Sequence, residues 1–418
     1  MKLGKYSIGI GDRFARQARA QLAACEQALT NGIEVTPVWN KSNREHMITG
    51  SDPSSTRQAA DAAVKALHWN FPYYCDADHI TLHTVDRFFA SCDFFTIDVA
   101  DSIGKSADAV DIDNFVKTNQ KLLGQIQLDG VDDTLEITQQ NLRQAAHKYL
   151  AAIHKAGEVY RAIENVKGTG NFISEVSMDE TDAAQSPVEL LIILAAVADG
   201  GIPIQTIAPK FSGRFNKGVD YVGDETQFGQ EFALDAAAIA YAVEHFGLPD
   251  NLKLSIHSGS DKFSIYSAIH AAIKRFDTGV HLKTAGTTWL EEVIGLAEAG
   301  GAGLALAKEI YTEAFKHSDE LCEPYATVID IDSSKLPCPA QVRDWSSEEY
   351  VAALRHRDDA AAYNSSLRQL LHVGFKVAAK MGNRYLDLLD DNESVIAKNV
   401  TENLYDRHIA PVFLGRSA

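Results

Sequence analysis

Three histidines in this chain stand where short apolar segments end, and such positions could form a metal site. Each of His79, His257 and His281 lies at or near the end of such a segment and is followed by small or polar residues. Neutral imidazoles that converge at one edge of a sheet are good ligands for Mn, Ni, Zn, Co or Fe. They would leave one position open for water or for a substrate oxygen. The alternative for each histidine is a hydrogen-bonded side chain in the core.

Carboxylates accompany these histidines. Asp78 directly precedes His79, and the pair Asp179-Glu180 follows another apolar segment. Two carboxylates on opposite walls of a metal pocket could act as general base and general acid. Either one could instead cap a helix or hydrogen-bond a metal ligand. The alternation of side chains favours an inward Asp179, but alternation is unreliable beyond a strand end, so Asp179 and Glu180 both remain candidates for the acid.

Positive side chains near the same segment ends indicate an anionic substrate. Lys283 and Lys210 are predicted to point toward one mouth, and Arg13 could reach it from a loop. The segment that begins with His257 and Ser258 has a glycine at its centre and leads into a predicted helix at Phe263. Backbone amides at such a helix start can bind an anion.

Eight apolar segments that alternate with helical patterns are predicted to position these residues. The segments are Tyr6–Gly11, Val35–Trp39, Pro72–Asp76, Phe94–Asp98, Phe172–Met178, Ile202–Ala208, Leu252–His257 and Gly279–Lys283. Strands that alternate with helices form parallel sheets, and eight units over about 300 residues are typical of a (β/α)8 TIM-like barrel. An open doubly wound sheet fits less well, because no glycine-rich dinucleotide fingerprint follows the first segment.

The alternation of side chains along these strands predicts which residues face the barrel interior. With Leu254 and Ile256 turned toward the outer helices, His257 faces inward, and by the same reasoning so do His281 and Lys283. The inward positions near the strand ends are polar or ionisable, whereas the core of a barrel needs branched apolar residues. We therefore expect these side chains to serve a function at that edge.

Two regions do not fit the repeating pattern. Residues 103–168, between the fourth and fifth strands, make this connection longer than the usual one between two barrel strands. Most of these residues have a helical pattern. We expect a helical insertion after strand 4 that acts as a subdomain or lid. Residues 318–418 are predicted to form a C-terminal helical extension packed on the barrel, which leaves 1–317 as the catalytic barrel.

Composition limits the class of protein. A net charge of −18 argues against binding of nucleic acid, and no apolar run approaches the roughly 20 residues of a membrane span. The N-terminus lacks the pattern of a signal peptide, and five cysteines without a CxxC pair suit a reducing cytoplasm. We expect a cytoplasmic protein that binds a small sugar acid, without nucleic acid or membrane as partners. Whether it forms a homo-oligomer stays open.

Several motifs, found in order from near residue 7 to about 375, resemble the tagaturonate/fructuronate epimerase family. They are Gly11–Phe14, Asp76–His79, Phe95–Asp98, Val176–Thr181, Gly218–Asp224, His257–Ser264, His281–Gly286 and Leu367–His372. The resemblance implies a metal-dependent enzyme that interconverts D-tagaturonate and D-fructuronate in hexuronate breakdown. It also implies a divalent metal cofactor, whose identity the sequence leaves open among Mn, Ni, Zn, Co and Fe.

The resemblance also implies roles for single residues. His79, His257 and His281 would bind the metal, Asp78 would be the base and Glu180 the acid, with Asp179 as the alternative acid. Lys210, Lys283, Asp261 and Lys262 would hold the carboxylate and hydroxyls of the substrate.

The carbon that is inverted lies β to the ketone, so simple enolisation does not make its C–H acidic. Three routes to the inversion remain: retro-aldol cleavage and re-addition, transient oxidation, and migration through a more remote enediolate. We favour the retro-aldol route, which needs a Lewis acid on the ketone and a base and an acid for the hydroxyl. The alternatives in function are a ketose 4-epimerase for tagatose and fructose, another metal-dependent sugar isomerase or aldolase, and a non-catalytic protein that binds sugar acids.

Overall fold

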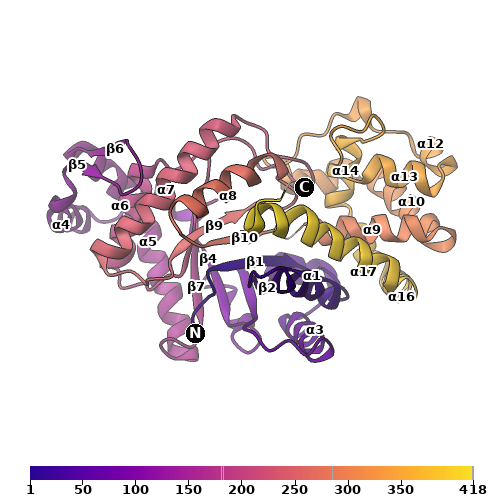
Figure 1. Ribbon diagram of the computed structural model, residues 1–418, viewed down its shortest axis with the longest axis horizontal. Coiled ribbons are helices and arrows are strands. Elements are labelled where there is room, and N and C mark those ends of the chain that lie inside the picture. Colours follow the sequence, from indigo (N-terminus) through magenta and orange to yellow (C-terminus); the bar gives the residue numbers. More distant parts are fainter. Residues whose placement is uncertain (180, 182, 285, 417–418) are drawn as a thin grey trace.

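A closed barrel of eight parallel strands lies between the insertion at the left and the C-terminal helices at the right of the molecule in Figure 1. The computed structural model describes all residues except 180, 182, 285 and 417–418. The barrel strands are β1 (Tyr6–Gly11), β2 (Thr36–Ser42), β3 (Tyr74–Ile80), β4 (Phe94–Asp98), β7 (Ile173–Ser177), β8 (Thr206–Ala208), β9 (Lys253–His257) and β10 (Val280–Lys283). They pair in chain order, and β10 closes the barrel against β1. The predicted TIM-like barrel is confirmed.

The interior of the barrel changes from apolar at one end to ionisable at the other. Leu3, Val38, Tyr74, Phe94 and Ile173 form a small cluster of buried apolar side chains near the starts of the strands. Two and four residues further along the same strands, the inward positions carry polar or charged groups. Successive inward positions on a strand are about 6.6 Å apart. The apolar cluster therefore closes the bottom of the barrel, and the ionisable layer lies at the carboxyl ends of the strands.

Helices and short 3-10 turns follow most of the strands and cover the barrel. They are α1 (Ala18–Thr30), α2 (Asn43–Thr49), α3 (Pro53–Ala66), η1 (Val85–Phe88), η2 (Ala100–Ser102), α6 (Pro187–Asp199), α7 (Glu225–Phe246), η4 (Phe263–Ile265), α8 (Tyr266–Arg275) and α9 (Thr287–Ala299). Helices α2 and α6 begin with capping boxes, formed by Ser42 with Glu45 and by Ser186 with Glu189. These side chains accept hydrogen bonds from backbone N–H groups that have no partner within the helix.

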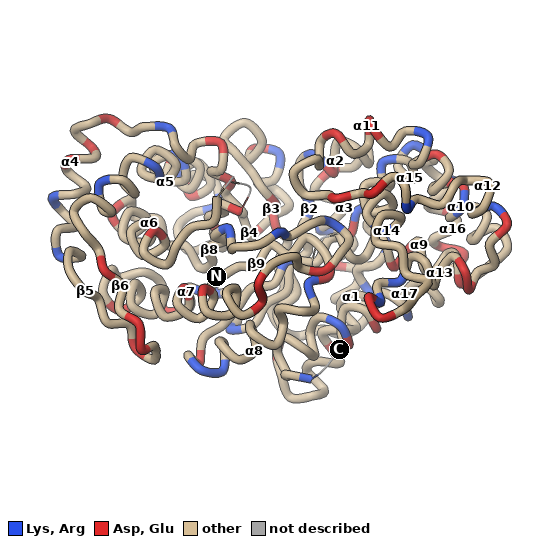
Figure 2. Tube along the Cα trace, turned by 90° about the horizontal axis from the view of Figure 1, so that it is seen from above, with Lys and Arg blue, Asp and Glu red and all other residues tan. Residues whose placement is uncertain are grey.

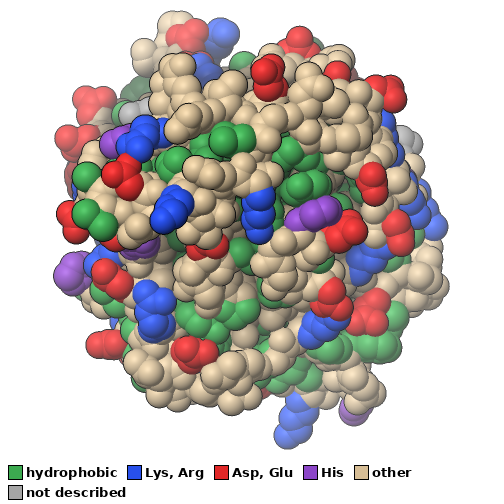
Figure 3. All heavy atoms as spheres, turned by 90° about the vertical axis from the view of Figure 1, so that its left-hand side faces the viewer, with side chains coloured by type: hydrophobic (Ala, Val, Ile, Leu, Met, Phe, Trp, Pro, Cys, Tyr) green, Lys and Arg blue, Asp and Glu red, His purple; other side chains and the backbone are tan. Residues whose placement is uncertain are grey.

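The insertion after β4 contains α4 (Ala109–Thr118), η3 (Gln120–Leu122), the hairpin strands β5 (Gly124–Gln127) and β6 (Thr134–Ile137), and α5 (Gln139–Lys167). Helix α5 packs beside α6, where the Lys148 ammonium and the Tyr149 hydroxyl both donate to Glu189. Asn119 donates to Asp199 at the end of α6. The antiparallel hairpin was not predicted. Figure 3 views this end of the molecule and shows acidic and basic side chains interspersed over it. The role of the insertion as a lid stays a prediction.

The C-terminal extension is helical, as predicted, and has its own core. Its elements are α10 (Gly301–Lys316), α11 (Ser318–Cys322), η5 (Glu323–Tyr325), η6 (Ser333–Lys335), α12 (Pro339–Asp344), α13 (Ser347–Leu354), α14 (Ser365–Val373), α15 (Phe375–Met381), α16 (Asn383–Asp391), α17 (Glu393–Glu402) and the π-helix η7 (Asn403–Leu414). The core of this region also takes Trp289 and Leu290 from α9. Seen from above, the extension stands beside the barrel (Figure 2).

The last helix of the chain returns to the barrel. Leu404, Ile409 and Phe413 of η7 belong to the same hydrophobic core as the outer faces of the strands. In Figure 1 the yellow helix lies between α1 and α8, where the outer helix after β10 would otherwise pack. This return ties the extension to the barrel at both of its ends. The division of the chain at residue 317 stays a prediction. Among the described residues, no helix is long and apolar enough to cross a membrane.

Candidate active site and metal centre

Strand β3 presents two consecutive side chains to the mouth of the barrel, which a regular strand cannot do. The pairing of β3 with β4 shifts register between Ala77 and Ile80, and His79 has a left-handed backbone with φ +51°. Asp78 keeps its inward place opposite Ser42. A non-glycine residue in this conformation is strained, and such strain is concentrated at functional sites. The distortion turns His79 toward the space above Asp78.

His79, Asp179 and His257 lie close enough to share a cation. Nε2 of His79 is 3.3 Å from Oδ1 of Asp179, and Nδ1 of His257 is 3.2 Å from Oδ2 of the same carboxylate. One potential ligand atom from each residue falls within a 4.8 Å cluster. The three side chains come from the ends of β3 and β9 and from the loop after β7. The carboxyl ends of the strands therefore meet here, as expected for a barrel enzyme.

A second pair of carboxylates fixes how the two imidazoles face Asp179. Nδ1 of His79 lies 3.0 Å from Oδ1 of Asp78, and Nε2 of His257 lies 2.8 Å from Oε1 of Glu175. If each histidine donates its N–H to that partner, its other nitrogen presents a lone pair toward the Asp179 carboxylate. Nδ1 of His257 is buried and makes no hydrogen bond of good geometry with any described residue. Lone pairs that face a carboxylate need a proton or a cation between them.

The charges below the cluster are unbalanced. The Lys283 ammonium lies 2.8 Å from Asp76, 3.0 Å from Asp78 and 3.0 Å from Glu175. Three carboxylates thus surround one ammonium, a fourth, Asp179, lies against the two imidazoles, and all of these groups are largely shielded from water. Burying uncompensated charge is unfavourable, so the arrangement favours the uptake of positive charge.

The titration of the groups reflects this imbalance. Burial raises the pKa of the Asp76 carboxyl to about 6, against the opposing effect of Lys283. Burial would lower the pKa of His79, but Asp78 and Asp179 outweigh it and hold that pKa well above its usual value. Burial likewise acts against a charged His257, yet Asp179 and Glu175 together raise its pKa. Protons are drawn to the atoms where a divalent cation would bind. Two imidazole nitrogens and a carboxylate oxygen are a fitting ligand set for such a cation.

His281 lies one layer lower in the barrel than the other two histidines. It pairs with Ser7 and Ser255 on the neighbouring strands, whereas His257 pairs with Lys283. Its Nδ1 is 2.9 Å from the Ser7 hydroxyl, and its ring lies 5.3 Å from that of Phe94 at the apolar bottom. Burial lowers the pKa of His281 to about 3, so the ring is neutral. Its role as a metal ligand stays a prediction that this placement does not support.

Two cavities open onto the cluster from the side of the C-terminal extension. A cavity of about 310 Å³ is lined by Asp78 and His79 and is called the His79 cavity here. Another of about 470 Å³ is lined by Asp179 and His257 and is called the His257 cavity. Arg44, Lys217 and Tyr325 line both. The cluster therefore lies at the base of a space with room for a small molecule and with basic walls.

The predicted substrate residues occupy different places around these cavities. Arg13 lines the His79 cavity and Lys210 the His257 cavity. The Lys210 ammonium donates to the backbone carbonyl of Thr181. Lys283 lies below the cluster among its carboxylates. Glu180, the predicted acid, lies outside the described residues.

The segment Ser258–Lys262 is buried and holds neighbouring backbone in place. The Ser258 hydroxyl donates to the Lys283 carbonyl at 2.6 Å, and the Lys262 ammonium donates to the carbonyls of Asn216 and Val219. Asp261 accepts from Arg368 at 2.7 Å. These contacts position the loop after β8 and the extension around the cavities. The direct contact with substrate that was predicted for Ser258, Asp261 and Lys262 stays a prediction.

Several residues of the cavity walls were not among the predicted site residues, and those with side chains that can bind an anion include Arg44, Lys217, Tyr325 and His372. His372 ends one of the motifs that carried the family resemblance, and this signal pointed to it. Arg44 lies in the short helix α2, Tyr325 ends η5 and Lys217 lies in a loop, and no motif in the local sequence marks them. The extension brings Tyr325 and His372 to the barrel, and that packing could not be read from the sequence.

Comparisons with known proteins agree with this fold. A protein-family model described as tagaturonate epimerase matches residues 1–411. The chain belongs to the tagaturonate epimerase family. It is therefore an enzyme of the isomerase type. The tagaturonate/fructuronate epimerase of Thermotoga maritima is 28% identical over 96% of this chain and 80% of its own length.

Solved structures of a relative share the fold. A two-glycerol complex of the fructuronate-tagaturonate epimerase from Cohnella laeviribosi superposes with a TM-score of 0.80, at 23% identity over 99% of this chain and 83% of that one. A one-glycerol complex of the same enzyme gives a TM-score of 0.77, again at 23% identity, over 97% of this chain and 82% of that one. The barrel together with its helical extension is thus an architecture that these proteins share.

Proposed function

We propose that the chain interconverts D-tagaturonate and D-fructuronate, with a divalent cation held by His79, Asp179 and His257. The observation that carries the proposal is the geometry of the two imidazoles, whose free nitrogens face one carboxylate at the base of a basic cavity. Family membership supplies the substrates, and the excess of buried carboxylates supports the cation. The metal is one of Mn, Ni, Zn, Co and Fe, because imidazole and carboxylate together suit all of these.

A cation bound there would polarise the ketone and a neighbouring hydroxyl of the substrate. The chain's own residues would handle the protons. Asp78 lines the His79 cavity and is our candidate for the base that takes the hydroxyl proton before the carbon–carbon bond breaks. If Asp179 holds the cation, Glu180 remains our candidate for the acid. A retro-aldol route needs these two groups on opposite faces of the sugar, because the aldehyde must turn over before the bond re-forms.

The competing functions are a 4-epimerase for neutral ketoses and a non-catalytic protein that binds sugar acids. The basic walls of both cavities favour an acidic sugar over a neutral one. A binding protein has no need for carboxylates directed at two imidazoles, since anion recognition uses positive groups and amides. Both observations support the epimerase of ketouronates.

The test is an assay of both ketouronates and both neutral ketoses. Protein stripped with a chelator should be inactive and regain activity when one of the five metals is restored. Fructuronate should be converted far faster than fructose. Faster conversion of fructose would overturn the choice of substrate, and full activity without metal would overturn the cofactor. Asp78→Asn and Glu180→Gln variants that keep both metal and full activity would overturn the assignment of base and acid.

A further inference from the structure

Most positive side chains near the cluster already have partners. Lys283 lies among carboxylates, Lys262 donates to backbone carbonyls, and Lys210 donates to the carbonyl of Thr181. Arg214 at the rim of the His257 cavity pairs with Asp330 at 3.3 Å. A substrate carboxylate must therefore be recognised by other groups on the cavity walls.

Arg13 offers one donor that is not in use. Its guanidinium is 7% exposed, donates from Nε to Glu45 at 3.1 Å and stacks on the ring of Phe375 at 4.2 Å. Its Nη1 is buried and has no hydrogen-bond partner among the described residues. A buried guanidinium N–H without a partner is costly, and Arg13 lines the His79 cavity. An anion in that cavity would satisfy it.

Lys217 stands beside Arg13 in the same cavity, on a loop that is held from several sides. Its backbone N–H donates to the carbonyl of Val328 in the extension. The next residue, Gly218, donates to the Ser260 hydroxyl and accepts from Arg368 at 2.7 Å. The ammonium of Lys217 has no ion-pair partner in the part of the chain that the structure describes. The loop thus presents a pre-positioned positive charge to both cavities.

His372 of α14 completes the group from the side of the extension. Its ring is buried, lines the His79 cavity, and has an Nε2 without a hydrogen-bond partner among the described residues. A methyl group at Gly286 would come within 2.0 Å of that nitrogen, so the glycine lets the loop after β10 approach it closely. Burial and the nearby charges of Arg13 and Lys217 hold the pKa of His372 well below its usual value. A neutral imidazole protonated on Nε2 can donate a hydrogen bond to an anion.

We propose that Arg13, Lys217 and His372 bind the carboxylate group of the sugar acid. The C-terminal extension then takes part in substrate choice, because it supplies His372 and anchors the loop that carries Lys217. This inference rests on the proposed function for the identity of the substrate. The geometry that carries it is the convergence on a single cavity of two buried nitrogen atoms and one ammonium that have no partner among the described residues.

Lys217→Met is the first test, because Lys217 is only half-buried and its side chain carries no packing role comparable to that of Arg13. Binding of D-gluconate, a six-carbon sugar acid, and of D-sorbitol, its neutral counterpart, would be measured by calorimetry. The dissociation constant for gluconate should rise roughly 10- to 100-fold, as expected when a hydrogen bond to a charged group is lost. That for sorbitol should not change. With ketouronate, the variant should show a raised KM and a nearly unchanged kcat.

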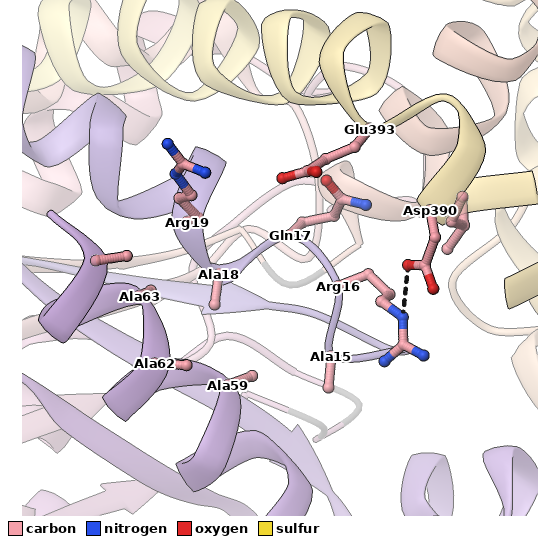
Figure 4. Close-up of a pocket in the computed structure, with 12 residues that line it drawn as sticks. Ala15, Arg16, Gln17, Ala18, Arg19, Ala59, Ala62, Ala63, Asp390 and Glu393 are labelled. Carbon is pink, nitrogen blue, oxygen red and sulfur yellow. Dashed lines mark ion pairs between the residues drawn. The ribbon is translucent and has the colours of Figure 1, made fainter. Parts of the chain in front are cut away.

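Arg16→Met is the matched control. Arg16 lies on the same loop as Arg13 but pairs with the exposed Asp390 at 2.9 Å and lines a different pocket, between α1, α3 and α16 (Figure 4). Its removal lowers the charge of the loop without touching the His79 cavity, so gluconate binding should stay as in the wild type. His372→Leu should weaken gluconate binding, and His372→Gln, which keeps a donor, should restore part of it.

Equal gluconate binding by the wild type and by both the Lys217→Met and the His372→Leu variants would overturn the inference. So would a wild type that does not distinguish gluconate from sorbitol. A wild type that binds gluconate through Lys217 but leaves both ketouronates unchanged would contradict the proposed function alone. The two proposals therefore fail in different ways.

Discussion

Two clusters of buried charge lie within this protein, and they are built differently. The first is at the barrel mouth around Lys283, where one ammonium faces Asp76, Asp78 and Glu175, with Asp179 above them. The second is centred on Asp261, where the barrel meets the extension. There one carboxylate accepts from Arg368 at 2.7 Å and from His356 at 2.9 Å, with His408 3.3 Å away.

The second cluster is balanced and closed. One negative and one positive charge compensate each other, and Asp261 and Arg368 are both fully buried. Arg368 also donates to the carbonyls of Gly218 and Leu354, and the Tyr266 hydroxyl lies 2.6 Å from Nδ1 of His408. Its groups come from the loop after β9, from α8, from the extension and from η7. Their pairing fixes how these elements join.

The difference teaches how a structural ion pair can be told from a functional one. Around Asp261 the carboxylate and the Arg368 guanidinium match in charge, and both are fully buried. Around Lys283 three carboxylates face one ammonium, two imidazoles face the Asp179 carboxylate above it, and two cavities open onto this layer. Stability alone favours the first arrangement, since unpaired buried charge is destabilising. The second is expected only where a cation and a substrate complete it.

The largest expected effect is the loss of activity in Asp179→Asn. An amide in place of the carboxylate removes the ligand that both imidazoles face, so metal content should fall and turnover should drop about ten-thousand-fold. The melting temperature of the metal-free protein should not fall, because one uncompensated negative charge is removed. Metal analysis, activity and thermal unfolding measure the three quantities. Asp277→Asn on the surface is the control. Bound metal and normal turnover in Asp179→Asn would contradict the assignment.

Asp261→Asn should act on stability instead. It leaves the buried guanidinium of Arg368 without its counter-ion, which costs about 3–5 kcal/mol of unfolding free energy. The folded fraction should retain its metal and its kcat, measured below the lowered melting temperature. Asp330→Asn removes the exposed partner of Arg214 and serves as the matched control, with no measurable change in melting temperature expected. A stable but inactive Asp261→Asn variant would place Asp261 in the chemistry.

Glu292 offers a third case, a buried carboxyl that forms no ion pair with a described residue. It accepts from the Tyr385 hydroxyl at 2.8 Å, and its other oxygen has no hydrogen-bond partner among the described residues. Burial, reinforced by Asp12, raises the pKa of Glu292 to about 8. A raised pKa means that the folded state favours the protonated form. The stability this contributes is complete below about pH 4.5 and is lost as the pH rises to about 8.

Glu292→Gln is neutral at every pH and should remove this dependence. The variant and the wild type should be about equally stable at pH 5, and the variant should be more stable by about 3 kcal/mol at pH 8. Denaturant unfolding at a series of pH values measures the difference in unfolding free energy between the two proteins. The contributions of all other titrating groups are the same in both and cancel. Parallel stability profiles for the two proteins would show that Glu292 is ionised in the folded state.

The barrel could be predicted because its outer surface obeys a simple rule. Val280 and Leu282 face the helices while His281 and Lys283 face inward, and this alternation is visible in the sequence. Strands β1 and β4 begin and end at the predicted residues. Strand β3 was predicted to end at Asp76 but continues to Ile80. The run of polar residues there resembles a loop in the sequence. In the folded protein Asp76 and Asp78 can lie on a buried strand because they pair with the buried Lys283.

The composition of the ligand cluster was harder to predict for two physical reasons. His79 points into the site through a register shift and a left-handed backbone, and no sequence pattern indicates either. His281 and His257 are both inward residues near the end of a strand, but His257 is the last residue of β9 and His281 lies two positions before the end of β10. A difference of two residues is about 6.6 Å along a strand, which is enough to place His281 one layer below His257.

The smallest expected effect concerns a residue that touches neither metal nor substrate. Glu175 is fully buried, and its Oε1 accepts from Nε2 of His257 at 2.8 Å. Glu175→Gln keeps the shape and an acceptor oxygen but weakens the charge that holds the imidazole N–H. Loss of such a partner lowers metal affinity about 10- to 100-fold. The metal concentration for half-maximal activity should rise by this factor, while turnover at saturating metal should change little.

The Glu175→Gln variant tests the difference between the two clusters, because removing a buried negative charge should affect stability in one cluster and metal affinity in the other. At Asp261 it should lower stability and leave metal affinity alone. At Glu175 it should lower metal affinity and leave stability nearly as it was, since Asp76 and Asp78 still pair with Lys283. A Glu175→Gln protein that binds metal normally but unfolds more easily would assign Glu175 to the same structural class as Asp261. That result would also mean that Asp179, and not Glu175, orients the His257 ring.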